Sequence, residues 1–245
     1  MKKELKRQIR EDEFVSGFAR ALTWIGAHRD EVRVTAVAVL AVLIGGGALG
    51  YYQSSRARDA RREFAAAVEM FHAPVAGESP AGEKPPTPGY ASASEKYRKA
   101  AAAFDGVERR FGSTPEGIRA RYYGALCRTE LGGEQELEQA RKALEDVAAR
   151  RDKPLESGLA RLALADLARR KGEVDKAIDG YRQLAEDPAA PLPRDVALMR
   201  IAEALDEAHR SAEAREAYKR VTDQYPGSVF ASEARQRAAY LGDGA

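Results

Sequence analysis

Residues 172–184 read GEVDKAIDGYRQL, and the pattern inside this stretch recurs along the chain. Ala177 is followed four residues later by the large apolar residue Tyr181 and three residues further on by the aliphatic Leu184. Positions three and four apart share one face of a helix, so the pattern predicts a helix that packs closely at its small residue. The same trio starts at Ala100, Ala140, Ala177 and Ala214, with Phe104, Leu144, Tyr181 and Tyr218 as the large residues and Val107, Val147, Leu184 and Val221 as the aliphatic ones.

A second series of small residues precedes the last three of these helices. Ala125, Ala165 and Ala202 lie 40 and 37 residues apart, which matches the spacing of the trios that follow them. The chain is therefore predicted to repeat a pair of helices, with this second series in the first helix of each pair. Three extra residues are expected in the turn near residues 132–135, and a helix over residues 229–241 is expected to cap the last pair.

This pattern resembles the tetratricopeptide repeat, a helix pair of about 34 residues with small residues at the close contacts and an aromatic residue in the second helix. The resemblance implies an all-α fold built as an α-solenoid. Spacings of 37 and 40 residues mark the repeats as divergent members of the type. A generic Ala-rich helical bundle is the alternative.

Ahead of the repeats, residues 34–52 read VTAVAVLAVLIGGGALGYY without a single charged side chain. A helix of this length spans about 28 Å, close to the thickness of the hydrocarbon core of a bilayer. We therefore expect one transmembrane helix at the N-terminal end of the solenoid. Gly46 and Gly50 form a GxxxG pair within it, which predicts a contact with another membrane helix and makes a homo-oligomer possible.

The remaining segments complete the predicted organisation. A leader over residues 1–33 carries eight Lys and Arg residues and an apolar helical face formed by Phe14, Phe18, Leu22 and Ile25. Residues 53–72 are expected to form the first solenoid helix and to continue directly from the membrane helix. Residues 73–91 hold five of the eleven prolines and are predicted to be a mobile insertion, and residues 92–241 hold the repeats and their cap.

The whole layout resembles the bacterial ancillary Sec translocon subunit family. The resemblance is carried by Asp12-Glu13-Phe14-Val15 and Trp24 in the leader, by Tyr51-Tyr52-Gln53 at the end of the apolar stretch, and by the divergent repeats. It implies an inner-membrane protein with a cytoplasmic N-terminus and a periplasmic repeat domain. It also implies partners among the translocon, periplasmic folding factors and client chains. Charge alone leaves the topology open, because Arg56, Arg58, Arg61 and Arg62 balance the basic leader.

In a tetratricopeptide solenoid the first helices line a concave groove that receives a peptide. Counting from the small residues places a shallow apolar strip with charges of both signs on that face, and ordinary inter-helix packing is the alternative for these positions. The predicted partner-binding residues are Tyr122, Leu126, Leu162, Asp166, Arg169, Met199, Glu203 and Asp206.

The sequence contains no motif for catalysis, a cofactor or a metal site. Its single cysteine, Cys127, sits in an apolar helix and is expected to be a small core residue, and three histidines are scattered along the chain. From residue 53 onward 32 basic and 32 acidic residues cancel, which argues against a nucleic-acid-binding domain. We therefore expect a non-enzymatic, membrane-anchored adaptor beside the translocon, or else a cell-envelope scaffold for outer-membrane biogenesis, secretion or division.

Overall fold

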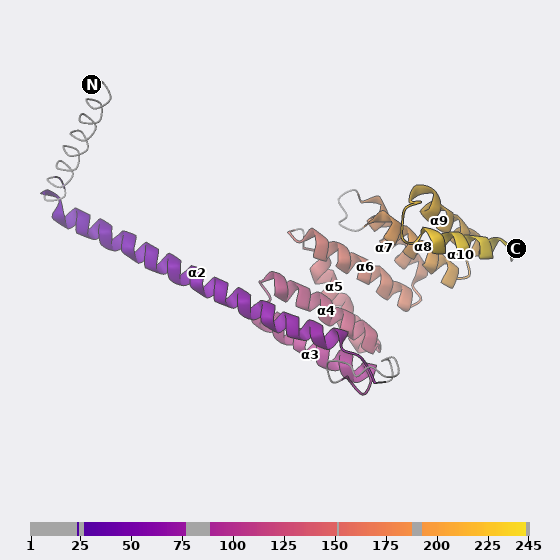
Figure 1. The fold of residues 1–245 in the computed structure, drawn as a ribbon, viewed down its shortest axis with the longest axis horizontal. Helices are drawn as coiled ribbons and strands as arrows, with labels where there is room; N and C mark the ends of the chain where they lie inside the picture. Colours follow the sequence, from indigo (N-terminus) through magenta and orange to yellow (C-terminus); the bar gives the residue numbers. More distant parts are fainter. Residues whose placement is uncertain (1–23, 25–26, 77–88, 151, 188–192, 244–245) are drawn as a thin grey trace, which may run out of the picture. The chain divides into compact units, whose positions relative to one another are not determined.

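The computed structural model describes every residue except 1–23, 25–26, 77–88, 151, 188–192 and 244–245 (Figure 1). The apolar face predicted in the leader and the centre of the Pro-rich insertion therefore lie outside the described residues. The described chain divides into two units, residues 1–56 and residues 57–245.

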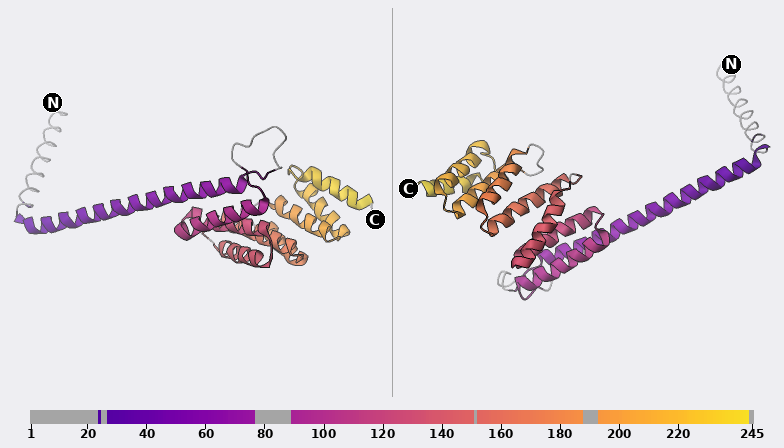
Figure 2. Two further views of the ribbon diagram at one scale, coloured as in Figure 1. Left: turned by 90° about the horizontal axis from the view of Figure 1, so that it is seen from below. Right: turned by 180° about the vertical axis from the view of Figure 1, so that it is seen from behind.

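Helices make up nearly all of the described chain. In order they are α2 (Arg29–His72), α3 (Ala93–Phe111), α4 (Pro115–Leu131), α5 (Glu134–Ala148), α6 (Pro154–Arg170), α7 (Val174–Glu186), α8 (Arg194–Glu207), α9 (Ser211–Gln224) and α10 (Ala231–Asp243). From α3 onward each helix packs chiefly against its neighbours in sequence, and Figure 2 shows these helices following one another from magenta to yellow. Packing restricted to sequence neighbours is the hallmark of a solenoid.

The predicted repeat is confirmed by the burial of its positions. Every alanine, large residue and aliphatic residue of the four trios is at most 2% exposed. Ala125, Ala165 and Ala202 are 0%, 4% and 0% exposed. Gly180 shows how closely the helices of a pair approach each other, because a Cβ at this position would lie 2.9 Å from the Cβ of Ala165.

Local signals explain where several helices begin and end. Ser92 accepts a hydrogen bond from the backbone N–H of Glu95 at the start of α3, and Thr114 accepts one from Gly117 at the start of α4. Pro115 and Pro154 occupy the first turns of α4 and α6, where a missing N–H costs nothing.

The prediction that three extra residues lengthen the turn of the second pair is wrong. Gly132 and Gly133, with φ of 71° and 82°, make a turn of two residues between α4 and α5. The corresponding turn between α6 and α7 has three residues, 171–173. The extra residues instead extend the two helices, because α5 begins six residues before Ala140 whereas α7 begins three residues before Ala177.

The last part of α2 is the first helix of the solenoid. Ala60 and Ala67 are 0% and 1% exposed in a core that they share with α3 and α4. The ring of Phe71 lies 5.5 Å from that of Tyr123, and the ring of Phe64 lies 5.9 Å from that of Phe104. Residues 57–72 and α3 thus form the first helix pair, whose core is more aromatic than those of the later pairs.

The described ends of the insertion are held together. The backbone N–H of Ala76 donates to the carbonyl of Tyr90 at 2.8 Å, and the N–H of Tyr90 donates to the carbonyl of Pro74 at 3.0 Å. Ala73 and Val75 are buried at 7% and 8% exposure. The segment therefore leaves and rejoins the solenoid at one fixed point.

In the unit formed by residues 1–56, the apolar side chains of α2 are open to the surroundings. Val34, Val42 and Leu43 are 70%, 74% and 66% exposed. By length and composition α2 is able to cross a membrane, and none of its most apolar window is buried in the described structure. Tyr51 and Tyr52, at the end of the apolar stretch, are 71% and 59% exposed.

Candidate partner-binding surface

The eight residues predicted to bind partners lie on α4, α6 and α8, the first helices of three successive pairs. Seven of them are half-buried and so remain open to a partner. Met199 is the exception, because it is 2% exposed and belongs to the core around α7, α8 and α9. Met199 is therefore a packing residue, although it lies 37 positions after the half-buried Leu162 and is its equivalent in the repeat.

The apolar part of this surface lies on α4 and α6. Tyr122 and Leu126 pack against the core of the second pair, and Leu162 packs against the core of the third. Burial, followed by the neighbouring Tyr123 and Asp166, raises the pKa of Tyr122 to about 12. The core against which Tyr122 and Leu126 pack also contains Ala160 and Ala163 of α6, so the strip continues from one helix pair to the next.

The charged part of the surface is largely neutralised within the chain. Arg169 Nη1 lies 2.6 Å from Glu207 Oε1, which joins α6 to α8. Arg200 Nη1 lies 2.8 Å from Glu203 Oε2 within α8. A partner on this surface meets charges that already have partners, so it gains little from new ion pairs there.

Two acidic groups of the predicted set bind core tyrosines. The hydroxyl of Tyr181 donates to Asp166 Oδ1 at 2.6 Å, and the hydroxyl of Tyr218 donates to Asp206 Oδ2 at 3.4 Å. Arg237 on α10 also approaches Asp206 Oδ2, at 4.0 Å. These carboxylates satisfy buried hydroxyls, and the alternative of structural packing accounts for much of what Asp166 and Asp206 do.

Sequence reasoning missed a second surface, formed where the second helices of neighbouring pairs meet the first helix between them. A hollow of about 430 Å³ between α6 and α7 shares Leu164, Ala168 and Lys176 with a smaller one of about 140 Å³ that reaches Leu137 and Arg141 on α5. Its floor is apolar and its rim is charged.

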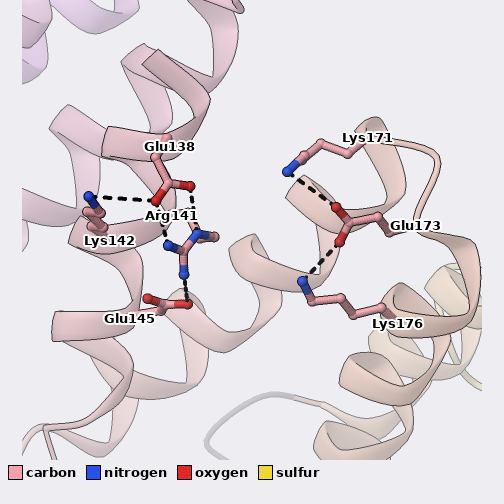
Figure 3. A network of polar contacts seen from close by, with 7 residues as sticks. All are labelled: Glu138, Arg141, Lys142, Glu145, Lys171, Glu173 and Lys176. Carbon is pink, nitrogen blue, oxygen red and sulfur yellow. Dashed lines mark hydrogen bonds and ion pairs between the residues drawn. The ribbon is translucent and has the colours of Figure 1, made fainter. Parts of the chain in front are cut away.

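Figure 3 shows the two sides of that rim. On α5, Glu138 pairs with Arg141 at 2.6 Å, and Arg141 also pairs with Glu145. Hydrogen bonding from Arg141 lowers the pKa of Glu138 to about 2. On the opposite side Glu173 lies 3.2 Å from Lys171 and 2.9 Å from Lys176. Acids and bases alternate on both sides, so the rim favours no charge in a ligand.

The same hollow recurs one repeat later. An open hollow of about 400 Å³ lies between α7 and α9, and its floor includes Ile201 and Leu205 of α8. These two residues lie 37 positions after Leu164 and Ala168, the repeat spacing itself. That spacing was the signal from which this second surface could have been found.

Other predicted features are placed as follows. Cys127 is fully buried, as expected, and burial raises the pKa of its thiol to about 12. A Cβ on Gly46 or Gly50 would meet no atom within 4 Å, so a partner helix at this GxxxG pair stays a prediction. Within the described ranges, no three His, Cys, Asp or Glu side chains gather as metal ligands would.

Comparisons with known proteins agree with this architecture. A family model described as a tetratricopeptide repeat-like domain matches residues 23–237, which include the apolar stretch as well as the repeats. No curated protein matches the chain.

Solved structures resemble the chain in fold alone. The TPR-like repeats of a protein described as a kinesin light chain from Podosopora anserina superpose with a TM-score of 0.50 at 15% identity, covering 74% of this chain and 84% of that one. A single-substitution variant of the same repeats gives a TM-score of 0.50 at 14% identity over the same shares. Repeats of this type are typically non-catalytic scaffolds for protein interaction. The chain belongs to the family of tetratricopeptide repeat-like domains.

Proposed function

We propose that the chain is a membrane-anchored adaptor whose solenoid holds protein partners at the bacterial inner membrane. The apolar part of α2 carries the proposal, because a run of exposed Val, Leu and Ile side chains is unstable in water and stable in lipid. The family match extends over this stretch and the repeats together, which supports one functional unit.

We further propose that the adaptor works beside the Sec translocon and periplasmic folding factors, with its N-terminus in the cytoplasm and its repeats in the periplasm. Support comes from the leader residues 12–15, from Trp24 and from the tyrosine pair that ends the apolar stretch. An envelope scaffold for another assembly is the competing function. It would be recognised by crosslinking of the chain to a different set of proteins.

The topology is tested with single cysteines. Cys127→Ala removes the native thiol, and Ser232→Cys places a new one on the exposed face of α10. Intact spheroplasts are treated with a membrane-impermeant maleimide. Labelling of Ser232→Cys before lysis is expected, whereas labelling only after lysis would place the repeats in the cytoplasm. The parent chain, with Cys127 buried, serves as the unlabelled control.

Partner binding is tested by photo-crosslinking in living cells. A photoreactive residue at Leu162 probes the first-helix surface, one at Arg182 probes the hollow between α7 and α9, and one at the exposed Arg98 on α3 is the control. Capture of translocon subunits or folding factors at Leu162 alone is expected. Capture at Arg182 alone would move the site to the second surface, and capture of another envelope assembly would favour the scaffold.

A further inference from the structure

Two arginines occupy the outer side of the first solenoid helix. Arg58 and Arg62 are each two residues from Ala60, which corresponds to about 160° around a helix of 3.6 residues per turn. Ala60 is fully buried, whereas both arginines are exposed. They therefore point away from the core that residues 57–72 share with α3 and α4.

In the part of the chain that the structure describes, the neighbouring residues Arg61 and Glu63 form ion pairs, whereas Arg58 and Arg62 form none. Arg61 Nε lies 3.4 Å from Glu116 Oε1, and Glu63 pairs with Arg110 of α3. Within the described residues, neither Arg58 nor Arg62 has a hydrogen bond or an ion pair. Two guanidinium groups four residues apart on one helix face repel each other modestly. An anionic partner bound between them would reduce this repulsion.

The chain places these arginines close to the proposed membrane segment. Arg58 follows Tyr52, the last residue of the apolar stretch, by six positions, and Arg62 follows it by ten. At 1.5 Å per residue these separations are about 9 Å and 15 Å along a helix. Headgroup regions add roughly 5–8 Å on each side of the hydrocarbon core, and an arginine side chain reaches several ångströms back toward the interface.

We propose that Arg58 and Arg62 bind the phosphate groups of anionic phospholipids in the leaflet next to the solenoid. This inference rests on the proposed membrane anchoring, and it holds for either topology because it needs only anionic lipid on that side. Guanidinium groups bind phosphate oxygens through paired N–H donors. The two arginines then fix the height and rotation of the first helix pair at the membrane surface.

An acidic protein surface is the competing ligand, and the chain offers no reason to prefer it here. The two groups lie within about one to two Debye lengths of the interface, where the potential of anionic lipids acts on them. Lipid already surrounds α2 once the helix is inserted, whereas an acidic protein must first be recruited from solution. Anionic lipid is therefore the occupant that the geometry favours.

The test uses the full chain, purified in detergent and titrated with phosphatidylglycerol or phosphatidylcholine, with bound lipids counted by native mass spectrometry. Arg58→Gln/Arg62→Gln is the test variant. Arg220→Gln/Arg235→Gln is the matched control, because it also removes two exposed arginines without a described ion pair, from α9 and α10. The parent chain should prefer phosphatidylglycerol, and the test variant should lose about tenfold or more of that preference.

Three results would overturn the inference. Parent and test variant could retain phosphatidylglycerol equally, the control could lose it as strongly, or the test variant could lose a co-purifying acidic protein while keeping the lipid. Extraction of membranes with alkaline carbonate separates this inference from the proposed function. Release of the parent chain contradicts the anchoring itself, whereas a retained chain without lipid preference contradicts only the role of the two arginines.

Discussion

The hydroxyl group of Tyr181 donates a 2.6 Å hydrogen bond to Asp166, and it does so from a ring that is fully buried between α6 and α7. The equivalent position of the preceding pair is Leu144, and the residue equivalent to Asp166 is Leu126. The second pair is thus apolar at both positions, while the third pair carries a donor and an acceptor. A buried hydroxyl needs such a partner, so the two polar residues depend on each other.

This dependence predicts a strong coupling in a double-mutant cycle. Asp166→Leu leaves the Tyr181 hydroxyl buried without an acceptor and should cost about 1–3 kcal/mol in the free energy of unfolding. Tyr181→Phe should cost about 0.5–1.5 kcal/mol. The double variant should recover part of the loss, because it rebuilds the apolar arrangement of the second pair. Urea unfolding measures all three, and simple additivity of the single changes would show that the bond contributes nothing.

Alkaline pH should weaken the solenoid through the same tyrosine. Burial, together with the bond to Asp166, raises the pKa of Tyr181. An unfolded tyrosine ionises near pH 10, so above this pH the unfolded state binds fewer protons than the folded state. The stabilisation is therefore complete below about pH 10 and is lost as the pH rises, by about 1.4 kcal/mol per pH unit for each such tyrosine.

Urea midpoints between pH 9 and pH 11 check this dependence. Tyr181→Phe should flatten the fall in stability, whereas Tyr240→Phe should leave it unchanged because the Tyr240 ring is 75% exposed. Burial also raises the pKa of Tyr218, so a residual slope is expected in Tyr181→Phe. An identical slope in the parent chain and in both variants would contradict the assignment.

The spacing of small and large residues was enough to predict the fold, because each trio fixes one buried helix face and the turns between pairs are short. Polar pairing could not be predicted in the same way. Asp166 and Tyr181 lie 15 residues apart on different helices, and their contact depends on how α6 and α7 cross. The same limit explains Met199, which is buried although its equivalent in the preceding pair, Leu162, is half-buried.

His209 gives a prediction in which a substitution stabilises the chain. Its φ of 58° puts a residue with a Cβ in the left-handed region, at the position where the preceding pair has Gly172 with φ of 76°. Both positions close the same motif, with backbone bonds of 2.9 Å from Arg210 to Leu205 and from Glu173 to Ala168. His209→Gly should therefore raise the stability by up to about 1 kcal/mol.

We expect the stabilisation by His209→Gly to raise the melting temperature by about 2–4 °C. Gly172→Ala is the converse variant and should lower the melting temperature by a similar amount. A drop for His209→Gly would mean that the histidine side chain contributes more than its backbone conformation costs.

Ala177 tests the repeat alignment itself. The residue is fully buried where α7 meets its neighbours, so Ala177→Trp forces an indole into space filled by adjacent helices. Overpacking of this kind costs about 1–3 kcal/mol or more. The exposed Ala102 on α3 provides the control, because Ala102→Trp adds the same side chain to the surface. Equal melting temperatures for the two variants would invalidate the alignment.

The aromatic contacts of the first pair lead to a prediction about fragments. Phe64 and Phe71 on α2 contact Phe104 and Tyr123, so the last part of α2 belongs to the folded solenoid. A fragment of residues 57–245 should fold without a membrane. One of residues 92–245 exposes Phe104 and its neighbours, at a cost of roughly 1.5–3 kcal/mol for each large side chain uncovered.

The two fragments are compared by thermal melting and by binding of a hydrophobic dye. The shorter fragment should melt several degrees lower and bind the dye, because the uncovered face of α3 and α4 has no substitute partner. Phe71→Ala in the longer fragment should produce part of the same loss, since it removes the ring that touches both Phe104 and Tyr123. Equal melting of the two fragments would mean that α2 only tethers the solenoid. A lower melting temperature for the shorter fragment would mean that the proposed membrane helix continues into the hydrophobic core of the first helix pair and stabilises it.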